Sequence, residues 1–139
     1  MASHIEKNKA LVRRIFTLLS EGKIEEGLEP FGPDGEWWVA GQNGPGMTMT
    51  VPEIAASFRG VLTGPAKGVQ FTERGMVAEG DRVLIEVVGE GKISTGHPYC
   101  NRYCFIFQIK DGVIVGGHEY MDTAHAASAF AGLGALREE

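Results

Sequence analysis

The sequence predicts an α+β fold in which helices pack on one face of a curved, mostly antiparallel sheet. Helical periodicity dominates the first 62 residues, the apolar pattern changes to a period of two near residue 69, and short turns then connect four strands. Helices gathered before an antiparallel meander are typical of this class. Such a chain forms a cone with an apolar pocket between helices and sheet, and 139 residues suit a single domain over 1–139.

The N-terminal elements follow from caps and apolar spacing. Ser3 and Glu6 fit a capping box, and apolar residues then repeat at helical spacing, so a helix is predicted over 4–20. A short second helix is predicted over 23–29, before the turn sequence PFGPDG. The next segment, EWWVA (36–40), indicates a short strand.

A glycine-rich stretch, GQNGPGMTMT (41–50), is predicted to be a loop, either a flap over a pocket or an ordinary connection. Its glycines lack phosphate-loop spacing. Thr50 and Glu53 form a second capping box, and Ile54 and Phe58 belong to the apolar face of the helix that follows. The remaining elements are strands at 69–78, 82–90, 98–110 and 113–121 and a helix at 123–131, for which Asp122 is the expected N-cap.

The composition excludes several classes of function. A net charge of −5 and a pI near 5.4 oppose nucleic-acid binding, which needs a basic surface. There is no run of about 18 apolar residues, so no membrane span is expected. The N-terminus lacks the layout of a signal peptide, and a cytoplasmic location is the expectation.

Counting alternate residues indicates which side chains face the pocket. In the strand at 98–110 the odd positions form the apolar face and include Tyr99, Tyr103, Phe105 and Phe107. Asn101 lies among these aromatics, where an amide without partners would cost about 1–3 kcal/mol.

In the last strand, the odd positions are Val113, Val115, Gly117, Glu119 and Met121. Glu119 is then a carboxyl group in an apolar surrounding, where burial would raise its pKa and suit it to general acid/base chemistry. If the even positions face inward instead, His118 and Tyr120 take that place. We favour the odd face.

Two earlier strands add candidates. Glu86 interrupts an apolar series between Leu84 and Val88, which makes it a possible second pocket acid or an outer-face carboxylate. In EWWVA, Trp37 and Val39 share the uncharged face and are the expected pocket wall.

The segment HPYCNRYCFIFQIKDGVIVGGHEYMDTAHAASAF (97–130) resembles the C-terminal half of SnoaL-like proteins. These belong to the nuclear-transport-factor-2-like (NTF2-like) superfamily, with ketosteroid isomerase, scytalone dehydratase, polyketide cyclases and limonene-epoxide hydrolase. The similar features are the Asn-Arg-Tyr entry, the Asp-Gly hairpin, and Glu-Tyr-hydrophobe-Asp-Thr before a helix. The resemblance covers residues 4–131 and implies an NTF2-like cone.

For the site, the resemblance implies that Glu119 occupies the position of a catalytic acid on the last strand of cyclases and epoxide hydrolases. The hydrolases also use an Arg-x-Asp pair, and those positions hold Glu86 and Val88 here, so the pair is absent. Ketosteroid isomerase's oxyanion tyrosine has no counterpart in the first helix, which contains no tyrosine. The family also implies a homodimer, with Arg102, Cys104 and Ile106 near the contact.

The resulting hypothesis is a cofactor-independent isomerase, dehydratase (lyase) or cyclase acting on a small, largely apolar oxygenated molecule. Glu119, Glu86 and Tyr103 are the predicted catalytic residues. The predicted substrate-binding residues are Trp37, Val39, Phe58, Asn101, Phe105 and Met121. No metal site is expected, because adjacent strand residues point to opposite faces. The alternatives are an epoxide hydrolase variant and a non-catalytic protein that binds a small ligand.

Overall fold

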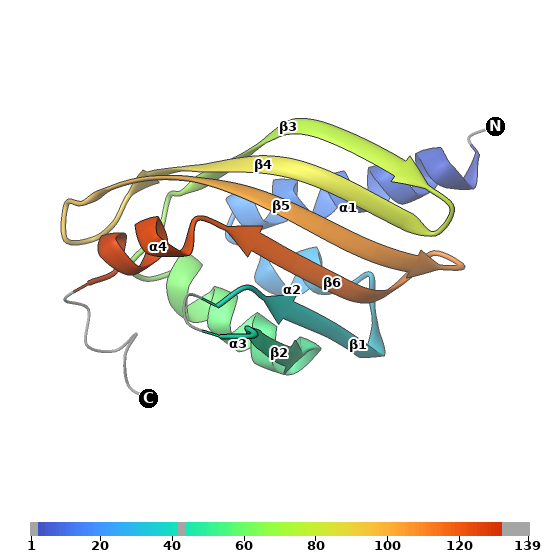
Figure 1. Cartoon of the computed structure of the whole chain (residues 1–139), viewed down its shortest axis with the longest axis horizontal. Helices are drawn as coiled ribbons and strands as arrows, with labels where there is room; N and C mark the ends of the chain where they lie inside the picture. Colours follow the sequence, from blue (N-terminus) through green and yellow to red (C-terminus); the bar gives the residue numbers. More distant parts are fainter. Residues whose placement is uncertain (1–2, 42–43, 132–139) are drawn as a thin grey trace.

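The computed structural model describes residues 3–41 and 44–131 and has the predicted α+β architecture (Figure 1). The order of strands in its sheet is β2-β1-β6-β5-β4-β3, and every neighbouring pair is antiparallel except β1 and β6. The elements are α1 (His4–Ser20), α2 (Ile24–Leu28), β1 (Phe31–Val39), β2 (Met47–Thr50), α3 (Val51–Leu62), β3 (Gln70–Glu79), β4 (Arg82–Lys92), β5 (Pro98–Lys110), β6 (Val113–Met121) and α4 (Thr123–Ala129).

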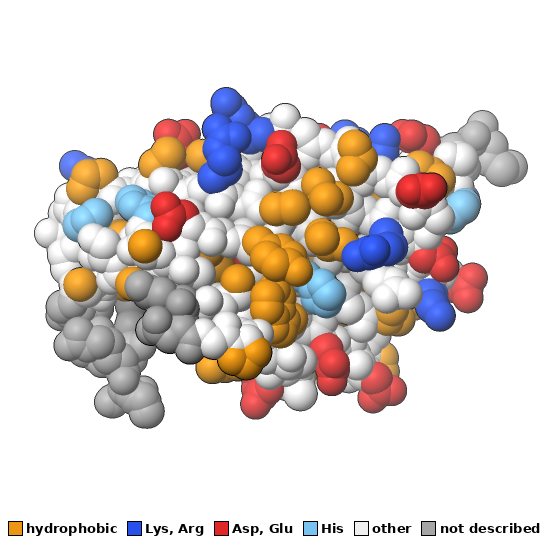
Figure 2. All heavy atoms as spheres, in the orientation of Figure 1, with side chains coloured by type: hydrophobic (Ala, Val, Ile, Leu, Met, Phe, Trp, Pro, Cys, Tyr) orange, Lys and Arg blue, Asp and Glu red, His pale blue; other side chains and the backbone are white. Residues whose placement is uncertain are grey.

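The two faces of the sheet differ in what covers them. Helix α1 lies behind β3 and β4, and α3 packs against β1 and β2, so the core fills the space between helices and sheet (Figure 1). On the opposite, outer face, hydrophobic side chains gather over the middle of the sheet (Figure 2). The rings of Trp38 and Tyr120 make a tilted contact there with centroids 5.1 Å apart, beside half-buried Leu84 and Ile106.

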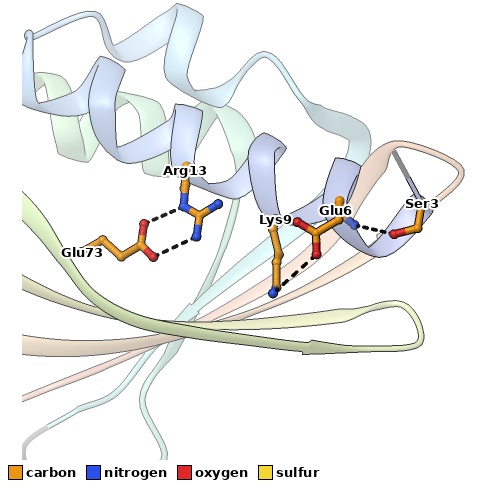
Figure 3. Close-up of polar contacts among 5 residues, drawn as sticks. All are labelled: Ser3, Glu6, Lys9, Arg13 and Glu73. Atoms are coloured by element: carbon orange, nitrogen blue, oxygen red, sulfur yellow. Dashed lines mark hydrogen bonds and ion pairs between the residues drawn. The ribbon is translucent and has the colours of Figure 1, made fainter. Parts of the chain in front are cut away.

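Helix α1 is fixed by its cap and by an ion pair. The Ser3 side chain accepts a hydrogen bond from the Glu6 backbone N–H at 3.2 Å, which is half of the predicted capping box, and the Glu6 carboxylate pairs with Lys9 at 3.7 Å (Figure 3). Arg13 donates two hydrogen bonds to Glu73 on β3, at 2.7 and 3.1 Å (Figure 3). This ion pair holds α1 against the sheet. The apolar face of α1, which includes Phe16, is buried between the helix and the sheet.

Two predictions for residues 30–50 are wrong. Strand β1 begins at Phe31 rather than at residue 36, because Phe31 pairs with Ile114 before an irregularity, and regular pairing resumes at Glu36. Residues 47–50, predicted to be loop, form the edge strand β2 and pair with β1. The alternating Met-Thr-Met-Thr pattern carried that signal, and the neighbouring glycines obscured it. Residues 42–43 of the predicted flap lie outside the described residues.

Strand β6 contains a bulge that changes which residues face inward. Ile109 of β5 pairs with Ile114, but Gln108 pairs with Gly116, so Val115 is an extra residue on β6. Ile114 is therefore buried on one side of the bulge, and Gly117 and Glu119 are buried on the other. The predicted odd face of this strand is wrong for Val113 and Val115, which are exposed, and correct for Glu119.

In the described parts of the chain, 3–41 and 44–131, no helix is both long enough and apolar enough to cross a membrane.

Candidate active site

A cavity of about 210 Å³ lies between the helices and the inner face of the sheet. Its wall is mostly apolar, and its aromatic rings come from helices, strands and the end of α4: Phe16, Trp37, Phe58, Phe71, Tyr99, Tyr103, Phe105 and Phe130. Glu119 is the one charged side chain among its described lining residues, which include no lysine, arginine or histidine. The cavity can therefore enclose an apolar molecule but offers no cation to pair with an anionic one.

Glu119 is positioned by its two neighbouring strands. It pairs with Val39 of β1 and Phe105 of β5, and only 8% of its surface is exposed. Trp37 Nε1 donates a hydrogen bond to Glu119 Oε1 at 2.8 Å. Burial disfavours the ionised carboxylate and raises the pKa of Glu119 to about 7, and the bond from Trp37 opposes this only in part. A carboxyl with this pKa can both accept and donate a proton near neutral pH.

Trp37 is held rigidly by the aromatic core. It is fully buried, and its ring makes edge contacts with Phe58, Phe105 and Phe107 at centroid distances of 5.2 to 5.9 Å. Gly117 makes room for this packing, because a Cβ at that position would lie 3.1 Å from the Phe107 ring. The indole N–H is thus fixed in the direction of Glu119.

Tyr103 lines the cavity on the strand next to Glu119. Its hydroxyl lies 2.5 Å from the Tyr99 hydroxyl, and the two share a hydrogen bond. Burial raises the pKa of Tyr103, so its hydroxyl is neutral and able to donate a hydrogen bond at physiological pH. Gly89 lies against this ring, and a Cβ there would come within 3.2 Å of it.

The structure corrects the prediction that Asn101 binds substrate. Asn101 is buried but does not line the cavity, and its amide bonds instead to the backbone of Asp122 and to the Tyr99 hydroxyl. A polar side chain on the apolar face of β5 thus has its partners within the protein. Asp122 is the N-cap of α4, as predicted, since its side chain accepts from the His125 N–H at 3.0 Å.

The structure also corrects the prediction that Glu86 is a second pocket acid. Its side chain is exposed on the outer face of β4, where it pairs with Cys104 of β5. Both faces of β4 carry apolar residues, so Leu84 and Val88 did not identify the inner face, which is formed by Val83, Ile85 and Val87. His118 and Tyr120, the alternative inward residues, lie exposed on the outer face as well.

The other predicted wall residues line the cavity: Trp37, Val39, Phe58, Phe105 and Met121. Sequence reasoning did not select Tyr99, Met49 or Ser57, which line it too. Tyr99 shares the parity of Tyr103, and that signal could have identified it. Met49 required recognition of β2. Among the residues described, no group of three or more His, Cys, Asp or Glu side chains is arranged to hold a metal ion.

An open, curved sheet wrapped over N-terminal helices, with a cavity that contains one buried carboxyl, defines a pocket protein of the NTF2-like class. A family model described as a SnoaL-like domain matches residues 12–116, and the chain belongs to this family. The matched segment ends before Glu119, so the case for that residue depends on its geometry.

Solved structures share the fold. PrhC from Penicillium brasilianum aligns with a TM-score of 0.84 at 18% identity, over 97% of this chain and 93% of its own. A Bacillus subtilis protein provisionally assigned as an isomerase aligns with a TM-score of 0.81 at 20% identity, covering 94% and 97%. TerC, co-crystallized with polyporic acid, aligns with a TM-score of 0.75 at 21% identity, covering 88% and 96%. No curated protein matches the chain in sequence.

Proposed function

We propose that this protein is a cofactor-independent acid/base enzyme, of isomerase, dehydratase or cyclase type, acting on a small, neutral oxygenated molecule. The observation that carries the proposal is a carboxyl group, 8% exposed and hydrogen-bonded to Trp37, whose pKa of about 7 suits proton transfer at neutral pH. The provisional assignment of the Bacillus subtilis neighbour as an isomerase agrees with this class.

The proposed reaction begins with proton transfer beside a carbonyl. The Glu119 carboxylate takes a proton from the carbon next to the carbonyl, and the C–H electron pair forms an enolate whose oxygen receives a hydrogen bond from Tyr103. In a β,γ-unsaturated ketone the enolate is conjugated with the double bond, so the carboxylic acid can return the proton to the γ-carbon, which completes an isomerisation to the α,β-unsaturated ketone. In a dehydration it instead protonates a β-hydroxyl group, which leaves as water. In a cyclisation the enolate carbon attacks a second carbonyl, whose oxygen takes the proton.

The alternative functions are weaker for specific reasons. An epoxide hydrolase variant with paired acids would need a second carboxyl group in the cavity, and Glu119 stands alone among the described lining residues. A non-catalytic binding protein would not require a desolvated carboxyl group, which destabilises the fold when it ionises. The open volume of about 210 Å³ fits either a substrate or a ligand.

The test is deuterium exchange, which needs no knowledge of the natural substrate. Acetophenone, 1-tetralone and 2-tetralone are incubated with the protein in D₂O, and loss of the α-proton signal is followed by NMR. Wild-type protein is expected to accelerate exchange, and Glu119→Gln is expected to lower that rate by about 10²- to 10⁴-fold, the usual contribution of a general base. Glu86→Gln, which changes an exposed carboxylate, is the matched control.

If wild-type protein and Glu119→Gln exchange all three ketones at the same rate, the acid/base role of Glu119 is refuted. Acceleration that survives in Glu119→Gln but is lost in Glu86→Gln would refute it equally.

We also propose that two copies pair through the outer face of the sheet, in the cytoplasm. Tyr120 is 41% exposed there beside the half-buried Trp38 and Ile106, and hydrophobic side chains cluster over the same area (Figure 2). A contiguous exposed apolar area of this kind is typical of an interaction surface.

A further inference from the structure

Three polar side chains on the inner face of β5 form a chain of hydrogen bonds that ends at the cavity. It starts at Asn101, whose Oδ1 accepts from the Asp122 backbone N–H at 3.1 Å and whose Nδ2 donates to the Asp122 carbonyl at 3.1 Å. A backbone N–H can only donate and a carbonyl can only accept, so these two bonds fix the orientation of the amide. The second Nδ2 hydrogen then points to the Tyr99 hydroxyl, 3.2 Å away.

The fixed amide sets the direction of the next bond. The Tyr99 oxygen already accepts a hydrogen bond from Asn101, and a phenolic oxygen accepts one bond well because its other lone pair is conjugated with the ring. Tyr99 therefore donates its own proton to the Tyr103 oxygen, 2.5 Å away. The Tyr103 proton has no further acceptor among the described residues and is available to a molecule in the cavity that Tyr103 lines.

We infer that Asn101 and Tyr99 are positioning residues that orient and polarise the Tyr103 hydroxyl as a donor to the carbonyl oxygen of a neutral ketone or aldehyde. The inference rests on the proposed function, because it supplies the group that would stabilise the enolate formed by Glu119. Each donor in such a chain strengthens the next, so the Tyr103 hydroxyl donates more strongly than an isolated phenol. Burial raises the pKa of both tyrosines, which keeps both protons in place.

The chemical class of the ligand follows from the same geometry. The Tyr103 oxygen already accepts a hydrogen bond from Tyr99, so the Tyr103 hydroxyl acts toward a ligand as a donor only. A ligand oxygen that can only accept a hydrogen bond suits this donor. A carboxylate or phosphate group would enter a cavity whose described lining includes no cationic side chain and does include a carboxyl group. A neutral carbonyl oxygen accepts a hydrogen bond without donating one and carries no net charge, so it suits the site on both counts.

The distance between the two groups also fits a carbonyl compound. Strand register places Phe105 opposite Glu119 and Tyr103 opposite Met121, so Tyr103 and Glu119 are diagonal neighbours on one face. Their α-carbons are then roughly 7–8 Å apart. Side chains that reach into the cavity from such positions can hold a carbonyl oxygen at one group and the adjacent carbon at the other.

The experiment measures the carbonyl stretch of bound acetophenone carrying ¹³C at its carbonyl, by isotope-edited infrared spectroscopy, together with its Kd by calorimetry. In wild-type protein the stretch is expected at a lower wavenumber than in Tyr103→Phe, which should also bind about 3- to 10-fold more weakly through loss of one hydrogen bond. Tyr99→Phe is expected to move the stretch part of the way to the Tyr103→Phe value. Tyr120→Phe removes an exposed hydroxyl from the outer face and should match wild type.

The double variant Tyr99→Phe/Tyr103→Phe separates a positioning role from a structural one. If Tyr99 acts through Tyr103, the double variant has the same stretch and Kd as Tyr103→Phe alone. A further shift in the double variant, or a wild-type stretch in Tyr99→Phe, overturns the inference. Absence of saturable acetophenone binding to wild-type protein overturns the ligand class.

None of these measurements requires turnover. A lowered stretch in a protein that exchanges no α-protons would therefore support the donor chain while refuting the role of Glu119.

Discussion

Replacing Glu119 with glutamine should make the protein more stable at pH 8 and change its stability little at pH 4.5. Glutamine keeps an acceptor for the Trp37 N–H, which lies 2.8 Å from the carboxyl, but cannot ionise. The pKa of Glu119 is raised from its ordinary value of 4.5 to about 7, and a tenfold change in a protonation equilibrium corresponds to about 1.4 kcal/mol. The ionised carboxylate therefore destabilises the folded protein by about 3 kcal/mol.

The sign of the effect follows from proton binding. Between pH 4.5 and 7 the folded protein binds a proton at Glu119 that the unfolded chain has released, so the free energy of unfolding falls as the pH rises through this window. The stabilising contribution of the protonated Glu119 is complete below the pKa that this group has in the unfolded chain. It is lost as the pH rises through the pKa of the same group in the folded protein. Glu119→Gln lacks this loss, and its advantage over wild type should grow by about 3 kcal/mol from pH 4.5 to pH 8.

Urea unfolding followed by circular dichroism at half-unit pH steps would measure this difference. Both proteins are compared at each pH, so charges elsewhere in the chain cancel. Glu86→Gln is the control, since it makes the same substitution at an exposed position of β4. If the advantage of Glu119→Gln changes by less than 1 kcal/mol over the range, the carboxyl group is solvated and the reasoning fails.

Three further outcomes are expected. Trp37→Phe removes the N–H that stabilises the Glu119 carboxylate, so the pH midpoint of ketone exchange should move above about 7; an unchanged midpoint would contradict the hydrogen bond. Asn101→Ala leaves the Asp122 backbone N–H and carbonyl without side-chain partners and should lower the free energy of unfolding by about 1–3 kcal/mol in urea titrations; unchanged stability would argue against these two hydrogen bonds. Ile106→Lys should convert a dimer to a monomer in light scattering, whereas a monomeric wild type would contradict pairing.

The strands and helices could be predicted because their signals are local. Strand β5 was predicted with its observed bounds, since its odd positions from 99 to 109 are aromatic or apolar except for Asn101 and the hairpin turn follows directly. The caps at Ser3, Thr50 and Asp122 were recognisable because each acts on a backbone N–H three residues away.

What the sequence could not reveal depends on how neighbouring strands pair. Glu119 was assigned to the cavity from a series that included Val113 and Val115, yet both are exposed because the bulge interrupts that series. The predicted burial of the carboxyl group at the cavity is confirmed, although the series on which the prediction was based is not. No local pattern indicates a bulge that arises from pairing between β5 and β6.

The roles of single polar residues were also beyond local reasoning. Asn101 was expected to hold substrate because it is a polar residue among aromatics, but its partner, the backbone of Asp122, is 21 residues away. Glu86 failed for a different reason, since β4 is apolar on both faces and its neighbours carried no information about direction.

The bulge at Val115 shifts the inward positions of β6 from the even parity of Ile114 to the odd parity of Gly117 and Glu119. A regular strand that kept Val115 and buried Ile114 would turn His118 and Tyr120 inward and place the carboxyl of Glu119 in water. The bulge thus determines whether the cavity presents a carboxylic acid or an imidazole. Deleting Val115 would remove the bulge and still leave Glu119 facing the cavity, because Ile114 and Gly116 already pair with the consecutive residues Ile109 and Gln108 of β5.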